Sequence, residues 1–309
     1  MSTEITTAFV QQYRSEVFHL SQQKGSVLQD KVRKETQTGK RQFFDRLGAV
    51  AAVPKTTRHS DTPQIDTPHS RRAVSLVDYE WADLIDKEDL RRMMMDPAGD
   101  YAMAAMWAFG RAKDDAIIAA ADGLAYGGEE GTQTVAHPNS QKIAAWNGSG
   151  LSGANVQFLR NIKKMLDKQD VDKSIKRYGV MTAQGFDDLL GITEVTSADF
   201  NTVRALVQGE INTYMGFEFD RTERLLAQVD ALSASTTTGA VGSGSSIIGH
   251  RRNIFWAQDG LLLSTAQDVQ AEIERRADKS YSTQVYASMG IGATRLEEEK
   301  VVIGFTDEP

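Results

Sequence analysis

Residues 96–123 read DPAGDYAMAAMWAFGRAKDDAIIAAADG, and this stretch carries the clearest structural signal in the chain. Asp96 is a suitable N-cap, Pro97 fits the first turn of a helix, and Gly123 suits its C-cap. Between these ends one broad stripe repeats at helical spacing and holds Met103, Met106, Trp107, Gly110, Asp114, Ile117, Ile118 and Ala121. The pattern predicts a helix over 97–122, roughly 38 Å long at 1.5 Å per residue, which is long for a globular protein.

The stretch 31–76, on the N-terminal side of this helix, has a different character. Its first part suggests a strand, a turn at Gly39 and a second strand. Residues 54–68 are rich in proline, threonine and charge, so they cannot form a core. Residues 72–79 then alternate like a returning strand. Because a structureless loop of this length is unusual within a compact domain, we predict a long β-hairpin arm that pairs outside its own fold.

The charge of the chain is unevenly distributed. Its 35 basic and 42 acidic residues give a net charge of -7. The segment from Lys24 to Arg72 is nevertheless basic, with a net charge of +6, which leaves -13 for the remainder. A basic projection on an acidic body favours contact between copies of one protein. There are two alternatives: the basic segment binds nucleic acid, or it is only a solvated loop.

The composition excludes several kinds of chemistry. The chain has no cysteine, which rules out disulfides, thiolate metal sites and cysteine nucleophiles. Its five histidines are scattered, so we expect neither a metal nor a cofactor. The longest nearly apolar stretch, 116–121, is far shorter than the roughly 20 residues of a membrane span. The N-terminus lacks the features of a signal peptide, and the chain is therefore expected to be soluble, made in a cytoplasm, and without membrane contact.

One motif favours an enzyme. Residues 148–153 read GSGLSG, which fits the dinucleotide-binding spelling G-x-G-x-x-G and precedes a predicted helix. Asp170 or Asp172 lies about 20 residues further on, where a ribose-binding acid is expected. The preceding residues 141–147, however, make a poor buried strand, so a nucleotide-binding enzyme that uses the Gly148–Gly153 loop is kept as the alternative function.

The adjacent carboxylates Asp114 and Asp115 are the other candidates for catalysis. Neighbouring residues on a helix point about 100° apart, so the two cannot share one site directly. We expect a solvated helix face with an ion pair between Arg111 and Asp115. No nucleophile, metal-binding or phosphate-binding motif accompanies them, and the chain is not expected to be an enzyme.

The remaining segments alternate between helical and strand patterns. Helical patterns occupy 3–24, 86–95, 154–168, 183–190 and 197–207, whereas strand patterns occupy 178–181, 214–219, 253–256, 260–264, 279–285, 287–293 and 301–305. Residues 124–153 and 236–249 are rich in small residues and are predicted to be loops. The fold class is therefore α+β.

The order of these parts, together with the local text, resembles a known family. The distinctive stretches are HSDTP at 59–63, DYEWADLID at 78–86, DP at 96–97, GRAKDDAII at 110–118 and GIGATRL at 290–296. They resemble the major capsid proteins of tailed bacteriophages, which have the Hong Kong 97-type fold. The resemblance covers most of the chain and carries no catalytic motif.

The resemblance implies a role for each segment. Residues 1–30 would form the N-terminal arm, 31–76 the extended β-hairpin loop, 77–150 the peripheral domain with its spine helix at 97–122, 151–265 the axial domain, and 266–309 the return to the peripheral β-sheet. The loop at 236–249 would lie at the centres of pentamers and hexamers.

The same resemblance implies the function and the partners. The chain would be a major capsid protein that assembles through hexamers and pentamers into the icosahedral head shell around double-stranded DNA. Its partners would be its own copies, a separate scaffolding protein, a portal and non-specifically bound DNA, with a decoration protein left open. It would be part of the virion, assembled in the bacterial cytoplasm. Within the extended β-hairpin loop at 31–76, the contacts with neighbouring subunits would be made by Lys40, Arg41, Phe43, Phe44, Arg46, Lys55 and Arg58.

Overall fold

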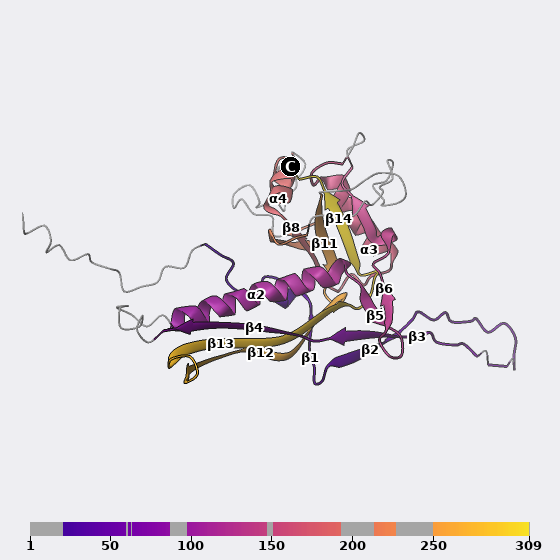
Figure 1. The fold of residues 1–309 in the computed structure, drawn as a ribbon. Helices are drawn as coiled ribbons and strands as arrows, with labels where there is room; N and C mark the ends of the chain where they lie inside the picture. The colour runs from indigo at the N-terminus through magenta and orange to yellow at the C-terminus, as the bar shows by residue number, and fades with distance from the viewer. Residues whose placement is uncertain are drawn as a thin grey trace, which may run out of the picture. The chain divides into compact units, whose positions relative to one another are not determined.

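The computed structural model describes residues 21–59, 61–62, 64–86, 98–146, 151–192, 213–226 and 250–308 (Figure 1). Its helices are η2 (Gln29–Lys31), α2 (Ala98–Asp122), η3 (Asn139–Gln141), α3 (Val156–Lys168) and α4 (Ala183–Leu190). Its strands are β1 (Arg33–Thr36), β2 (Arg41–Leu47), β3 (His69–Ser75), β4 (Val77–Ile85), β5 (Ala125–Gly127), β6 (Gln133–Val135), β7 (Lys142–Ala144), β8 (Arg177–Met181), β9 (Thr213–Tyr214), β10 (Phe217–Arg221), β11 (Arg251–Ala257), β12 (Leu261–Arg276), β13 (Ser282–Arg295) and β14 (Val301–Thr306). The predicted mixed α+β content is confirmed.

The chain divides into two compact units. The first comprises Met1–Ser26, Asp78–Arg111 and Gln267–Met289, and the second comprises Val27–Val77, Ala112–Ala266 and Gly290–Pro309. In the first unit, buried Ile85 and Val285 form a small core with Trp81, Tyr101 and Ala102. No described helix is long and apolar enough to span a membrane.

The second unit contains a six-stranded mixed sheet with the order β7-β14-β11-β8-β10-β9. Strand β11 runs antiparallel to β14 and β8, whereas β7 is parallel to β14 and β10 is parallel to β8. Helix α3 packs along β14 and β7 (Figure 1). Its start is fixed by Asn155, whose side chain accepts a hydrogen bond from the Phe158 backbone N–H at 2.7 Å. Its apolar stripe is buried in the core of this unit at Phe158, Leu159, Ile162 and Leu166.

A second sheet of this unit has the order β2-β3-β5-β6. Strands β2 and β3 form a regular antiparallel hairpin in which Arg41 pairs with Ser75 and Leu47 with His69. Strand β5 pairs with β3 on its other side, and β6 follows at the edge. The long hairpin predicted within 31–76 is therefore present, although its strands occupy only the part nearest the sheet.

The long helix predicted over 97–122 is observed as α2. Asp96 and Pro97, expected at its start, lie outside the described residues. Its buried positions include Ala105, Phe109, Ile117, Ile118 and Ala121. In contrast, Met103 and Met106, which lie on the predicted stripe, are 45% and 55% exposed.

The strands near the C-terminus differ from the sequence prediction. In place of separate strands at 279–285 and 287–293, residues 277–281 form a turn and β13 runs without a break from Ser282 to Arg295. Strand β12 extends to Arg276 rather than ending at residue 264, within a sheet of order β1-β12-β13-β4. Backbone pairing along a neighbouring strand sustains β12 where its side chains are exposed and polar. The helices predicted at 86–95 and 197–207, the loop at 236–249 and most of the helix at 3–24 fall outside the described residues, and residues 21–24 are not helical.

Candidate inter-subunit interface

Beyond strands β2 and β3, the hairpin continues as an extended tip formed by residues 48–68. One backbone hydrogen bond, from Gly48 N–H to the Pro68 carbonyl at 2.8 Å, closes the end of the paired region. Every described residue from Leu47 to Ser70 is exposed. Figure 1 shows this tip running out past β2 and β3. Within a single chain, the tip therefore has no core of its own.

The tip carries apolar side chains as well as charges. Leu47 is 68% exposed, Val50 and Val53 are each 57% exposed, and Ile65 is 46% exposed. Full burial of such a side chain is worth about 1.5–3 kcal/mol, so covering the half that faces solvent would gain roughly 1 kcal/mol for each. Three such side chains on the tip, with Leu47 next to them at the end of β2, are typical of a surface that another molecule covers.

The base of the hairpin is held by its own subunit. The Phe44 ring packs against Val74, Leu262 and Leu296. The Arg46 guanidinium donates to the Leu296 carbonyl and lies 3.6 Å from a Glu298 carboxylate oxygen. These contacts connect β2 to β12 and to the residues that follow β13, so the base of the hairpin is held in place by its own subunit, whereas the tip is not.

Glu298 collects three guanidinium groups at this base. Arg72, fully buried on β3, donates to its Oε1 atom, and the Nε of fully buried Arg295 lies 3.7 Å from the same oxygen. Burial lowers the pKa of the Arg72 and Arg295 guanidinium groups, and the Glu298 carboxylate opposes that shift. With Arg46, three positive groups share one carboxylate, so Glu298 is the central counter-charge of the cluster.

Arg295 also closes the C-terminal end of helix α2. Its Nη1 atom donates to the Ala121 carbonyl at 2.8 Å and to the Gly123 carbonyl at 3.1 Å. A cation is favourable here because the last carbonyls of a helix carry partial negative charge. The hairpin base and the end of α2 are thus joined through one buried cluster.

The seven predicted interface residues separate into two groups. Alternation along β2 places Phe43 and Phe44 on opposite faces. Five of the seven are exposed, namely Lys40, Arg41, Phe43, Lys55 and Arg58. The Arg41 guanidinium donates a hydrogen bond to the Ser75 hydroxyl at 3.2 Å. The Arg71 guanidinium lies over the Phe43 ring, 5.5 Å from its centre. Phe44 and Arg46, in contrast, are turned toward their own subunit. Five of the predicted interface residues are therefore available to another molecule, whereas Phe44 and Arg46 anchor the base of the hairpin.

With this geometry in hand, the chain can be compared with known proteins. Residues 5–308 match the model of a family described as phage capsid protein. The chain belongs to the phage capsid protein family. This capsid protein is a major subunit of a phage head and forms its icosahedral shell. No curated protein sequence matches the chain.

Solved structures show the same fold over nearly the whole capsid protein. The capsid of cyanophage P-SCSP1u is 15% identical with a TM-score of 0.74, covering 100% of this chain and 96% of that one. The capsid of Ralstonia phage GP4 is 12% identical with a TM-score of 0.69, covering 97% and 96%. A structure from Mycobacterium phage Che8 is 17% identical with a TM-score of 0.65, covering 96% and 97%. The fold is of the Hong Kong 97 type.

The capsid protein uses Asp114 and Asp115 differently from the sequence prediction. Asp114 is fully buried and accepts hydrogen bonds from the backbone N–H groups of Val27 and Leu28, both at 3.1 Å. Asp115 accepts from the Arg224 guanidinium rather than from Arg111. The predicted solvated face is wrong, and the signal was present: Asp114 lies on the same stripe as the apolar residues of α2. This carboxylate anchors the backbone at residues 27–28 to helix α2.

The nucleotide-binding alternative gains no support in the capsid protein. Gly148 to Gly150 lie outside the described residues. At the start of α3, the Asp188 carboxylate lies against Gly153 and accepts from the Ala154 backbone N–H at 3.2 Å. A negative group therefore occupies the position where a pyrophosphate would bind. Strand β7, which precedes the motif, is a three-residue edge strand rather than a central one.

Proposed function

We propose that this capsid protein assembles through hexamers and pentamers, and that the tip of its extended hairpin lies on a neighbouring copy. The exposure of every described residue from Leu47 to Ser70 is the observation that carries this proposal. A tip of this length gains order only by packing against another surface. Copies of the same chain are the partner that a shell places next to it.

Within this proposal, the two groups of hairpin residues have different tasks. Lys40, Arg41, Phe43, Lys55 and Arg58 would contact the acidic body of the next subunit, which matches their charge. Phe44 and Arg46, held by their own chain, would set the direction in which the tip projects. Contacts between exposed charges weaken with salt, so assembly should be sensitive to ionic strength.

Each segment of the chain would then form a distinct part of the shell subunit. We assign the N-terminal arm to 1–30, the extended loop to 31–76, the peripheral domain with its spine helix to 77–150, the axial domain to 151–265 and the peripheral return to 266–309. The loop at 236–249 would meet its symmetry mates at capsomer centres.

The remaining partners are those that a phage head requires for its assembly and for the packaging of DNA. A separate scaffolding protein would guide assembly in the bacterial cytoplasm, a portal would occupy one vertex, and DNA would fill the interior without sequence preference. The chain itself would act as a structural protein rather than an enzyme and would need no cofactor.

Charge reversal at the tip tests the proposal. The variant Lys55→Glu/Arg58→Glu should stay folded as a subunit yet fail to form particles in negative-stain electron microscopy. The control, Arg275→Glu/Lys279→Glu, makes the same charge change at exposed positions near the end of β12 and in the turn that follows it, and should assemble. Normal particles from the tip variant, or equal failure of both variants, would contradict the assignment of the tip.

A further inference from the structure

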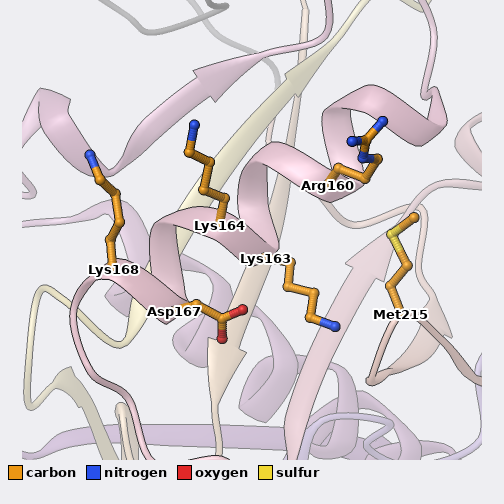
Figure 2. A pocket seen from close by; sticks show the side chains of 6 residues that line it. All are labelled: Arg160, Lys163, Lys164, Asp167, Lys168 and Met215. Carbon is orange, nitrogen blue, oxygen red and sulfur yellow. The ribbon is translucent and has the colours of Figure 1, made fainter.

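The described surface around helix α3 carries a second basic region, distinct from the hairpin. Its members are Arg160, Lys163, Lys164 and Lys168 on α3, with Lys173 and Lys176 on the segment that follows. They line two adjoining open depressions of about 500 and 460 Å³ beside the turn at Met215. Figure 2 shows Lys164 and Lys168 projecting from one side of the helix and Lys163 from another. We call these six residues the α3 basic surface.

Within the described residues, the acids beside the α3 basic surface leave most of its positive charge unpaired. Its central acid, Asp167, already accepts a hydrogen bond from the Arg177 guanidinium at 2.8 Å. Asp172, on the following loop, accepts from the Ser174 backbone N–H at 2.8 Å. Asp170 is the third acid of this stretch and is exposed. Among the described residues, no acid forms an ion pair with any of the five lysines of this surface, Lys163, Lys164, Lys168, Lys173 and Lys176.

The composition of this surface favours a phosphate backbone over a protein partner. The centres of protein–protein interfaces are depleted in lysine and enriched in aromatic residues. Here five lysines and two arginines outnumber one acid, Asp167, and two apolar side chains, those of Met215 and Ile175, and neither lining contains an aromatic ring. Lysine contacts to phosphates position a nucleic acid without reading its sequence.

The spacing along the helix also suits a polyanion. From Arg160 to Lys168 the helix rises about 12 Å at 1.5 Å per residue. One strand of duplex DNA presents a phosphate about every 3.4 Å along its axis, so three or four phosphates fit along this line. The long lysine side chains can adapt to the exact path of the backbone.

We propose that the α3 basic surface binds the phosphate backbone of double-stranded DNA without sequence preference, as the inner contact of the shell. The inference rests on the proposed packaging of DNA by this capsid protein, and it names the surface that makes the contact. It assigns this role to α3 rather than to the basic hairpin.

The test uses the full-length unassembled protein and a labelled 30-base-pair duplex of arbitrary sequence, with binding followed by fluorescence anisotropy between 50 and 200 mM salt. The variant Lys163→Gln/Lys164→Gln/Lys168→Gln removes three contacts. Each phosphate contact contributes about 0.9 to the slope of log affinity against log salt, so the slope should fall by about 2.7. Affinity at 0.1 M salt should then fall by about 500-fold.

A matched variant, Lys40→Gln/Lys55→Gln/Arg58→Gln, removes the same charge from the hairpin and should bind DNA almost as the unmodified protein does. Unchanged affinity of the α3 variant, or an equal loss from the hairpin variant, would overturn the inference.

Particle formation by the α3 variant is scored separately by negative-stain electron microscopy. Loss of particles with DNA affinity retained would assign the surface to a neighbouring copy and also overturn it, whereas intact shells with weakened DNA binding support it. Failure of the unmodified protein to form particles would count against the proposed assembly and not against the DNA contact.

Discussion

Replacing Glu298 by glutamine removes the one negative charge that Arg72, Arg46 and Arg295 share. The amide keeps the shape of the side chain, so the change is electrostatic. Breaking a buried ion pair by removing one partner costs about 3–5 kcal/mol. The Glu298 side chain is 20% exposed, which favours the lower end, about 3 kcal/mol. For a unit of this size, 1 kcal/mol corresponds to about 2–4 °C in Tm, so we expect the Tm to fall by about 6–12 °C.

Differential scanning calorimetry of the unassembled protein measures this shift. The control is Glu297→Gln, because Glu297 makes a more exposed pair with Lys300 at 3.2 Å. Such a pair is worth about 0.2–1 kcal/mol, so the Tm of this variant should change by about 4 °C at most. Equal shifts for the two variants would refute the view that Glu298 is the central counter-charge of the hairpin base.

Three further predictions concern buried positions. Asp114→Asn removes an acceptor of the two backbone N–H groups at 27–28 and should lower stability by about 1–3 kcal/mol, with faster hydrogen exchange at those amides; unchanged exchange would contradict the anchor. Gly110→Ala places a methyl group against the Gly25 backbone and should cost about 1–3 kcal/mol and expose the segment to limited proteolysis; a fully protected segment would argue against this contact. Burial lowers the pKa of His137 to about 4 from its ordinary 6.5, so the unfolded chain takes up the proton first, and stability should fall by roughly 3 kcal/mol between pH 6.5 and 4. In the variant His137→Gln, the stability measured by chemical denaturation should depend less on pH over this range. The same pH dependence as in the unmodified protein would contradict the role of His137.

The sequence allowed the elements with strong local signals to be predicted. Helix α2 has a regular stripe and a glycine at its end, and α3 has the capping residue Asn155 before its apolar face. The β2–β3 hairpin was predictable because the intervening residues cannot form a core. In each case the signal lies within the element itself, which is why sequence reasoning could find it.

The buried charges could not be predicted in the same way. Glu298 stands in a run of three glutamates that resembles a solvated tail. Arg295 is only three positions away, but the fold alone brings Arg72 to it, from a strand 226 positions away. Asp114 was misread because its partners are backbone N–H groups 86 and 87 positions away. The inward turn of Arg46 likewise depends on the Leu296 carbonyl, which belongs to a strand end that sequence spacing cannot place.

The protection of the hairpin tip on assembly tests the central claim most directly. The chain has no cysteine, so Val53→Cys introduces a single thiol at a position that is 57% exposed in the subunit. Its rate of reaction with a soluble maleimide is compared between unassembled protein and purified particles. If the tip lies on a neighbouring copy, the rate should fall at least about tenfold in particles, which is the population shift that about 1.4 kcal/mol of contact energy produces. An equal rate in both states would contradict the claim.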